Sequence, residues 1–422
     1  MAIQRGTADL PATADGHRIA LVMSGGGARG AYEAGVLGYL LDDLPHRLGR
    51  PIHFDIVTGT SVGAIHACYV AGTMGDPAAG VGLADIWRSL DVGGVYDLGA
   101  ADLIAIPLRL LGLSGERRPA EPGIPERLAG VLDTRPLERL VRERIPWAEL
   151  RRRIDAGAIE SVAVTATEMG SGKSIVWVDN RAGVVRPWVH DPFVIARPVR
   201  LNPGYALASS AIPFLFPVLK IGDGYYCDGG LRLNTPLAPA LRLGADRLLI
   251  VGLQHHPTPE EEARLAPARE ARYNSLAYLG GKVLNALLLD HVDYDVDRLR
   301  LVNAILDTGI RLYGPDFLPR MNETIEALRG TPYKVVKNLY LRPSRDLGII
   351  ATDCLEQHHP PTGLRRQLSH AFIRYAVHGV VAEADLLSYV LFDRCYADHL
   401  IELGRADAEA HADDLAAFFA EG

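Results

Sequence analysis

A serine between two glycines is the residue best suited to nucleophilic chemistry. Ser61 lies in Gly59-Thr60-Ser61-Val62-Gly63, which has the pattern G-x-S-x-G. Residues 53–58 before it read as a strand, and the small apolar residues 62–70 after it read as a helix packed closely on a sheet. In such a strained turn both glycines are needed, because backbone segments approach too closely for a Cβ. We therefore predict that Ser61 presents its Oγ at the positive end of a helix, as a nucleophile does.

A glycine-rich loop precedes this serine. Residues 18–23 form a short apolar run, Ser24-Gly25-Gly26-Gly27-Ala28-Arg29-Gly30 follows, and residues 31–41 have helical spacing. A loop of this kind at a helix start leaves backbone N–H groups pointing outward. Such donors bind phosphate in nucleotide sites, and they equally hold the oxyanion of a tetrahedral acyl intermediate. Taken alone, the loop is compatible with both.

A third motif, Cys227-Asp228-Gly229-Gly230, completes a set. The three motifs together resemble the patatin-like phospholipase family, which carries G-G-G-x-R/K-G, then G-x-S-x-G, then D-G-G or D-G-A. Here they occupy residues 25–30, 59–63 and 228–230, without departure from the pattern. Residues 132–137, 208–213 and 341–344 are also similar to segments of that family. The resemblance spans about residues 18–350.

The resemblance implies a catalytic dyad without a histidine. Asp228 would contact Ser61 directly and accept its proton, although a free aspartate, with a pKa of about 3.9, is a weak base. Partial burial would raise that pKa. The oxyanion would be held by backbone N–H groups of Gly25, Gly26 and Gly27, chiefly the last two. The supporting residues would be Gly59, Gly63, Gly229, Gly230 and Arg29, the last either bracing the loop or facing an anionic headgroup.

The implied activity is that of a phospholipase or esterase, in which an acyl-Ser61 intermediate is cleaved by water. A lipid transacylase would use the same residues with an alcohol in place of water. A Ser-Asp-His esterase is a further alternative, because His255 and His256 follow the strand-like residues 247–253. The glycine loop could instead be the G-x-G-x-x-G fingerprint of a dinucleotide site. Such a site also has an acidic residue about twenty positions later that binds the ribose, and none of Asp42, Asp43 and Asp55 stands out in that role.

Composition predicts one large α/β unit. The 422 residues are 48% hydrophobic, which is enough for a sizeable core. Alternating strands and helices predict a three-layer α/β/α fold with a mostly parallel central sheet. We expect an N-terminal lead-in over residues 1–17, a catalytic domain over 18–350 and a helical extension over 351–422. The net charge of −7 argues against nucleic-acid binding, and the chemistry requires no metal or organic cofactor.

Location is predicted from cysteines and apolar segments. Four widely spaced cysteines suit a reducing, cytoplasmic compartment without disulfides. No secretory signal is apparent in residues 1–17, and no run is long enough to span a bilayer. A lipid substrate nevertheless implies peripheral membrane contact. Residues 103–113 are a candidate interfacial lid or a core helix, and residues 214–216 either line an acyl pocket or pack in the core.

Overall fold

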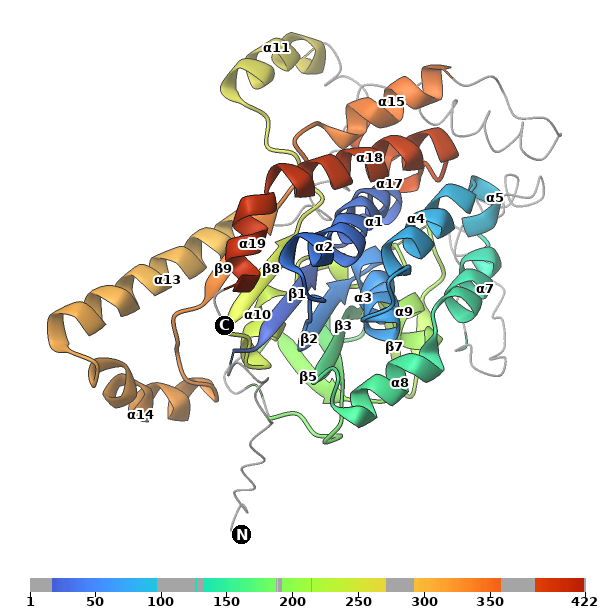
Figure 1. Ribbon diagram of the computed structural model, residues 1–422. Helices are drawn as coiled ribbons and strands as arrows, with labels where there is room; N and C mark the ends of the chain where they lie inside the picture. The colour runs from blue at the N-terminus through green and yellow to red at the C-terminus, as the bar shows by residue number, and fades with distance from the viewer. Residues whose placement is uncertain are drawn as a thin grey trace.

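One mixed β-sheet organises the molecule. The computed structural model describes residues 17–96, 126, 132–186, 188, 192–213, 215–270, 292–357 and 384–420. Within these residues, nine strands form a sheet in the order β5-β4-β3-β2-β1-β8-β9, and β7 pairs with β3 and β6 (Figure 1). The strands are β1 (Ile19–Met23), β2 (Ile56–Thr60), β3 (Ser161–Glu168), β4 (Ser174–Asn180), β5 (Val194–Pro198), β6 (Leu219–Ile221), β7 (Gly224–Asp228), β8 (Arg247–Val251) and β9 (Lys337–Leu341).

The sheet is mostly parallel, as the sequence predicts. Strand β1 pairs in parallel with both β2 and β8, and the parallel pairs β2–β3 and β8–β9 extend the sheet on either side. The antiparallel pairs are β3–β4, β3–β7 and the hairpin β6–β7. The carboxyl ends of β1 and β2 therefore lie at one edge, which is where open α/β sheets keep their sites.

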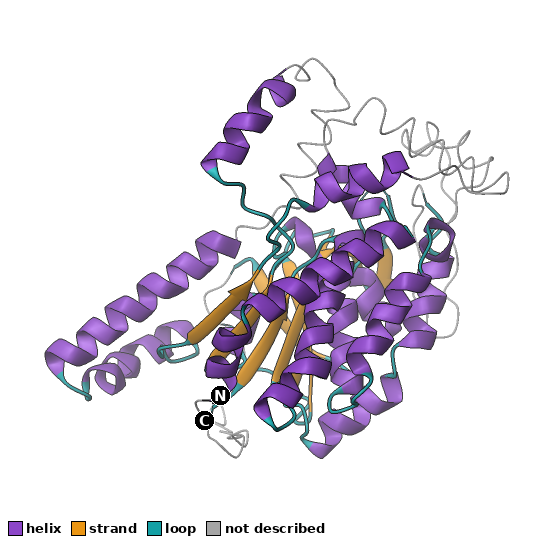
Figure 2. Cartoon of the chain, turned by 45° about the horizontal axis from the view of Figure 1, so that its top comes forward, coloured by secondary structure: helices purple, strands orange, loops and turns teal. Residues whose placement is uncertain are grey.

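Alternation along the strands divides the core between the two faces of the sheet. Leu21 and Leu249 belong to one apolar cluster, which includes residues of α1 (Gly30–Gly38) and α3 (Val62–Thr73). Their neighbours Ala20 and Leu248 belong to another, with residues of α10 (Leu237–Arg242) and α13 (Val292–Tyr313). This period of two is what a strand buried on both faces requires. The result is the predicted three-layer α/β/α arrangement (Figure 2).

Other helices surround these layers. The hairpin of α13 and α14 (Phe317–Arg329) projects from the β9 edge of the sheet in both views (Figures 1 and 2). The remaining helices are η1 (Gly27–Arg29), η2 (Tyr39–Asp43), α2 (Leu44–Leu48), α4 (Ala79–Ser89), α5 (Val92–Val95), α7 (Arg135–Arg144), α8 (Trp147–Ala156), α9 (Pro203–Ser209), η3 (Gly229–Leu231), α11 (Pro259–Glu270), α15 (Leu347–Gln357), α17 (Ala384–Val390), α18 (Arg394–Ala410) and α19 (Ala412–Ala420).

The C-terminal helices pack directly on the α/β unit. Helix α18 lies against α1 so closely that a Cβ on Gly35 would meet the carbonyl of Ile401, and one on Gly404 would meet that of Tyr32. The Tyr32 hydroxyl also donates to Asp407 Oδ2 at 3.0 Å, and burial raises the pKa of this tyrosine well above its ordinary value. The domain boundary at residue 350 stays a prediction, although the C-terminal helices share the main apolar core.

Cysteine pairing was predicted wrongly. Cys354 and Cys395 form a disulfide, whereas Cys68 and Cys227 are free and buried. The packing of α15 beside the start of α18 brings the two Cα atoms to 6.0 Å across 41 residues of sequence, which linear spacing does not reveal. The inference of a reducing compartment thereby loses its support. These two cysteines and His399 are the only described residues with metal-ligand spacing, and the bonded sulfurs are not free to bind an ion.

Surface helix α11 occupies Pro259–Glu270, with Glu260, Glu261 and Glu262 in its first turn, where the helix dipole favours acidic side chains. The candidate lid at 103–113 and nearly all of the N-terminal lead-in lie outside the described residues. Among the helices that are described, none combines the length and apolar character needed to cross a bilayer.

Candidate active site

Sheet register brings Ser61 and Asp228 together. Along one edge of β3, β2 pairs until Thr60 lies opposite Thr165. On the next residue of β3, β7 takes over, with Asp228 opposite Ala166. Strand β4 occupies the other edge of β3, so β7 must continue in line with β2. The first residue after β2 is therefore beside the last residue of β7, 167 positions later in the chain.

The backbone of Ser61 adopts a strained conformation that its neighbours stabilise. Ser61 has φ 56° and ψ −124°, and it is the only non-glycine residue with positive φ among those described. Its N–H donates to Ser209 Oγ at 2.9 Å, and its carbonyl accepts from Ser210 Oγ at 3.0 Å. Ser209 Oγ in turn donates to the carbonyl of Thr165 at 2.5 Å. Strain of this kind persists only where the surroundings hold it, and here two consecutive serines do so.

The side chains of Ser61 and Asp228 are in direct contact. Ser61 Oγ donates to Asp228 Oδ2 at 2.6 Å, and the two residues are 4% and 2% exposed. The other carboxylate oxygen, Oδ1, accepts from Gly230 N–H at 2.7 Å. Burial raises the pKa of Asp228 to about 6, against the lowering effect of its bonds to Ser61 and Gly230. The carboxylate is therefore a stronger base than an exposed aspartate and is still mostly ionised at neutral pH.

The predicted supporting glycines lie at close backbone crossings around this pair. A Cβ on Gly59 would meet the carbonyl of Gly63, and one on Gly63 would meet the carbonyls of Met23 and Ser24. A Cβ on Gly229 would meet the carbonyl of Thr165, and Gly230 lies against Asp228 itself. The first three positions therefore exclude any side chain, as the two motifs imply.

The glycine-rich loop lies beside Ser61, and its three glycines differ in their hydrogen bonds. A Cβ on Gly25 would come within 3.0 Å of Ser61 Cβ. The Gly25 N–H, however, already donates to the carbonyl of Asn234 at 3.1 Å, and Asn234 Nδ2 donates back to the carbonyl of Gly25 at 3.1 Å. Within the described part of the chain, no acceptor contacts the N–H of Gly26 or Gly27. These two donors are thus available to a ligand, whereas that of Gly25 is not.

Arg29 links the glycine-rich loop to helix α17. It is 4% exposed, its Nε donates to Ser388 Oγ at 2.7 Å, and its guanidinium lies 4.2 Å from the ring centroid of Tyr389. The carbonyl of Tyr389 abuts Gly27, which has φ 56°. Of the two roles considered for Arg29, these contacts favour bracing over headgroup binding. Helix α17 is therefore part of the support of the loop, a role that the sequence did not reveal.

No described histidine is placed to complete a triad. His255 contacts the carbonyl of Pro343 at 3.1 Å and Glu261 Oε2 at 3.2 Å, and His256 pairs with Asp293. The buried His66, on α3, is closer to the site in sequence. Its Nε2 accepts from the indole N–H of Trp87 at 2.9 Å, so its Nδ1 carries the proton and donates to Glu33 at 2.8 Å. Both ring nitrogens are thereby occupied.

The His66 network also reaches the glycine-rich loop. The second carboxylate oxygen of Glu33 accepts from Ser24 N–H at 2.9 Å, and burial raises the pKa of this glutamate. Ser24 Oγ contacts Thr235 Oγ1 at 2.5 Å. A chain of buried polar contacts therefore runs from Trp87 through His66 and Glu33 to Ser24, at the start of the glycine-rich loop, and it holds the loop in place.

A narrow apolar pocket opens beside Ser61. It has a volume of about 60 Å³. Its walls come from α3, α4, α7 and the segments around Ile212 and Phe392, and Arg144 is its one lining arginine or lysine among the described residues. Of residues 214–216, for which an acyl pocket and core packing were both considered, Phe216 lines this pocket and also belongs to the main apolar cluster, and residue 214 lies outside the described residues. The principal apolar residues are Ile65, Leu83, Trp87, Leu140, Ile212 and Phe216.

Comparison with known proteins identifies what the chain is similar to. A family model described as patatin-like phospholipase matches residues 21–241, just over half of the chain. A cGAMP-activated phospholipase of Pseudomonas aeruginosa is 29% identical over 224 residues, which are 51% of this chain and 53% of that protein. The chain thus spans about half the length of this curated relative. The crystal structure of VipD from Legionella pneumophila aligns with a TM-score of 0.35 and 14% identity, covering 94% of this chain and 74% of VipD.

Proposed function

The chain belongs to the patatin-like phospholipase family, and we propose that it cleaves acyl esters of lipids through a dyad of Ser61 and Asp228. The observation that carries the proposal is the 2.6 Å hydrogen bond between Ser61 Oγ and Asp228 Oδ2. It joins a nucleophile on a strained turn to a buried base, directly beside an apolar pocket. The parts needed for covalent acyl transfer are therefore adjacent.

Acylation begins when Ser61 Oγ attacks the ester carbonyl while Asp228 Oδ2 accepts the hydroxyl proton. The raised pKa of about 6 makes Asp228 basic enough to accept that proton. The negative charge that develops on the carbonyl oxygen is stabilised by the N–H groups of Gly26 and Gly27. Loss of one such donor typically costs about 10²–10³ in rate. Protonated Asp228 then donates to the departing alcohol, which leaves an acyl-Ser61 ester.

Deacylation repeats these roles with water. Asp228 accepts a proton from water as its oxygen attacks the acyl carbon, and the same two N–H groups hold the second oxyanion. The intermediate collapses, the fatty acid leaves and Ser61 regains its proton. A lysolipid or other alcohol in place of water would give transacylation with the same residues. Release of free fatty acid, measured against transfer to an added lysophospholipid, separates these two reactions.

The lipid substrate is supported by the pocket. Its lining by Ile65, Leu140 and Phe216 suits the first methylenes of an acyl chain. The exposed Arg144 suits an anionic headgroup or the carboxylate product. Since such substrates are presented in bilayers, we propose peripheral contact with a membrane at this face. A Ser-Asp-His esterase is less well supported, because His66, His255 and His256 each contact other groups.

The proposal is tested by intact-mass measurement after treatment with a long-chain fluorophosphonate. Wild type should gain one adduct, Ser61→Ala none, and Ser171→Ala, which removes an exposed serine from the β3–β4 turn, should match wild type. Because the Pseudomonas relative is named as cGAMP-activated, each protein is treated with and without cGAMP. An adduct that depends on Ser61 in either condition supports the proposal. Absence of labelling in both, on folded protein, would refute it.

A further inference from the structure

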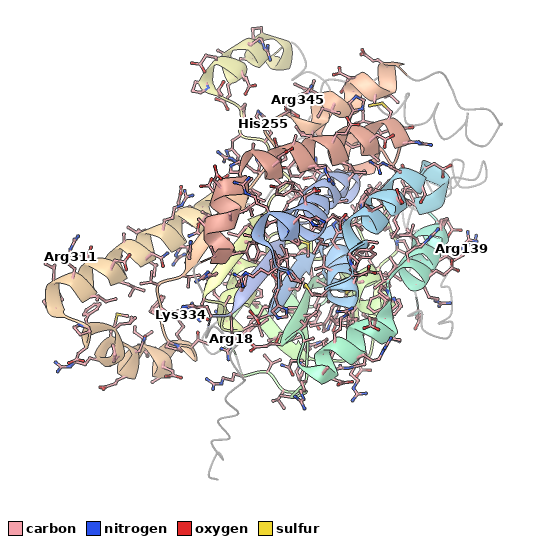
Figure 3. The ribbon with its side chains drawn as sticks, viewed as in Figure 1. Arg18, Arg139, His255, Arg311, Lys334 and Arg345 are labelled. Carbon is pink, nitrogen blue, oxygen red and sulfur yellow. A yellow bond between two sulfur atoms is a disulfide. The ribbon has the colours of Figure 1, made fainter. Side chains whose placement is uncertain are left out.

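A second cavity lies apart from the catalytic pocket, on the α10 face of the sheet. It has a volume of about 390 Å³, within the roughly 300–1,000 Å³ range of small-molecule sites. Its walls are α10, α13, the end of α14 and the segment leading to β9. None of its lining residues belongs to the catalytic pocket. Figure 3 shows Lys334, one of those residues, where the α13–α14 hairpin meets the sheet.

The described lining of this cavity is strongly cationic. It includes Arg242, Arg298, Arg329 and Lys334, and Asp295 is its one acidic residue. The Lys334 ammonium is held by the carbonyl of Gly244 at 2.7 Å and by Asp246. Arg298, by contrast, is exposed and forms no ion pair with any described residue. The Lys334 charge is therefore offset by Asp246, and the three arginines carry the positive charge of the lining.

Two of the arginines repel one another. Burial lowers the pKa of Arg329, and the neighbouring positive charge of Arg242 lowers it further, while Tyr333 opposes this shift. Each guanidinium also lies over an aromatic ring, Arg329 at 4.4 Å from the centroid of Tyr333 and Arg242 at 5.3 Å from that of Trp188. The rings restrict where the guanidiniums can move. An anion between the two would relieve the repulsion.

The floor of the cavity is apolar. Leu237 and Leu299 are buried there, and Leu241, Val302 and Val336 also line it. A bare inorganic ion would leave this surface in contact with water, whereas an organic anion would cover it. Arginine forks favour phosphate oxygens in particular, because they bind them with paired hydrogen bonds. We propose that this cavity binds an organic phosphate, with its phosphate groups on Arg242, Arg298 and Arg329 and its organic part on the apolar floor.

The test measures binding directly, on the Ser61→Ala protein, so its outcome is independent of the proposed hydrolase activity. Calorimetric titration with ADP, which carries two phosphates and a ring system, is compared with inorganic pyrophosphate. Arg298→Gln and Arg329→Gln should each weaken ADP binding by about 10–100-fold, the loss of one charge-assisted contact. Arg311→Gln is the matched control. It removes an exposed arginine from α13, the helix that carries Arg298, at the far end of the α13–α14 hairpin (Figure 3).

A second arm distinguishes a soluble phosphate from a lipid headgroup. Phosphatidylcholine vesicles with and without phosphatidic acid are sedimented with the same proteins. Binding of ADP that depends on Arg298 and Arg329 supports the site with a soluble ligand, and selective binding to phosphatidic acid with that dependence supports it with a lipid. Pyrophosphate should bind more weakly than ADP, since it cannot cover the apolar floor. The proposal is overturned if the protein binds neither ADP nor vesicles that contain phosphatidic acid. It is also overturned if Arg298→Gln and Arg329→Gln both bind as tightly as Arg311→Gln does.

Discussion

Replacement of Asp228 by asparagine should inactivate the protein and stabilise it at the same time. Burial raises the pKa of Asp228 to about 6, from 3.8 for an unperturbed aspartate. Between these values the folded protein binds more protons than the unfolded chain, so the contribution of Asp228 to stability falls as pH rises. Above pH 6 the ionised carboxylate opposes folding by about 3 kcal/mol, since each pKa unit is worth about 1.4 kcal/mol.

Asparagine has the same shape without the charge, and its carbonyl oxygen can still accept from Gly230 N–H. The free energy of unfolding of Asp228→Asn should therefore exceed that of wild type by about 3 kcal/mol at pH 8, with the gain disappearing toward pH 4. Loss of the base should slow Ser61 labelling by about 10²–10⁴.

Urea denaturation of both proteins at several pH values measures this gain. The control is Asp223→Asn, which removes the same charge from an exposed position in the β6–β7 turn and should change stability little. A variant no more stable than wild type at pH 8, or a gain that does not vary with pH, would refute the assignment of Asp228 as a destabilised, functional base.

Two further predictions concern labelling of Ser61 by the fluorophosphonate. In wild type the labelling rate should be half-maximal near pH 6 and about tenfold below its maximum at pH 5, because protonated Asp228 cannot accept a proton. The rate is measured by mass spectrometry on samples quenched at set times. A midpoint below pH 5 would mean that a different or unburied base acts. Gly27→Ala should slow labelling by at least about 10², because a methyl group would meet the Tyr389 carbonyl at a residue with φ 56° and displace the oxyanion donor. Unaltered labelling of that variant would exclude Gly27 from the oxyanion site.

The sequence predicts the strand and the turn that carry Ser61 because the motif around this serine expresses a local requirement. Ser61 needs flanking glycines wherever the strand-to-helix turn is strained, and Gly59 and Gly63 indeed exclude a Cβ. The order of apolar runs then predicted a mostly parallel sheet, which fixes the carboxyl ends of β1 and β2 on one edge.

What the sequence could not predict depends on contacts between distant segments. Asn234 occupies the N–H of Gly25, and Ser209 holds the N–H of Ser61 from 148 residues away. Ser209 lies within residues 208–213, a segment similar to one of the family, and Asn234 follows the Asp228 motif, yet nothing in either residue type reveals these contacts. The disulfide of Cys354 and Cys395 was missed for the same reason, since pairing depends on how α15 and α18 pack.

The contact between Arg29 and α17 determines when, during synthesis, the glycine-rich loop can be held in place. Arg29 emerges from the ribosome early, but Ser388, which holds it, follows 359 residues later. A nascent chain thus contains both Ser61 and Asp228 before the glycine-rich loop is braced, because α17 is synthesised after both residues. Chains grow and fold from the amino end, so we expect a product terminated before α17 to carry Ser61 and Asp228 without a braced glycine-rich loop. Under the proposed function, activity should therefore appear only once α17 has been made and has packed against the glycine-rich loop.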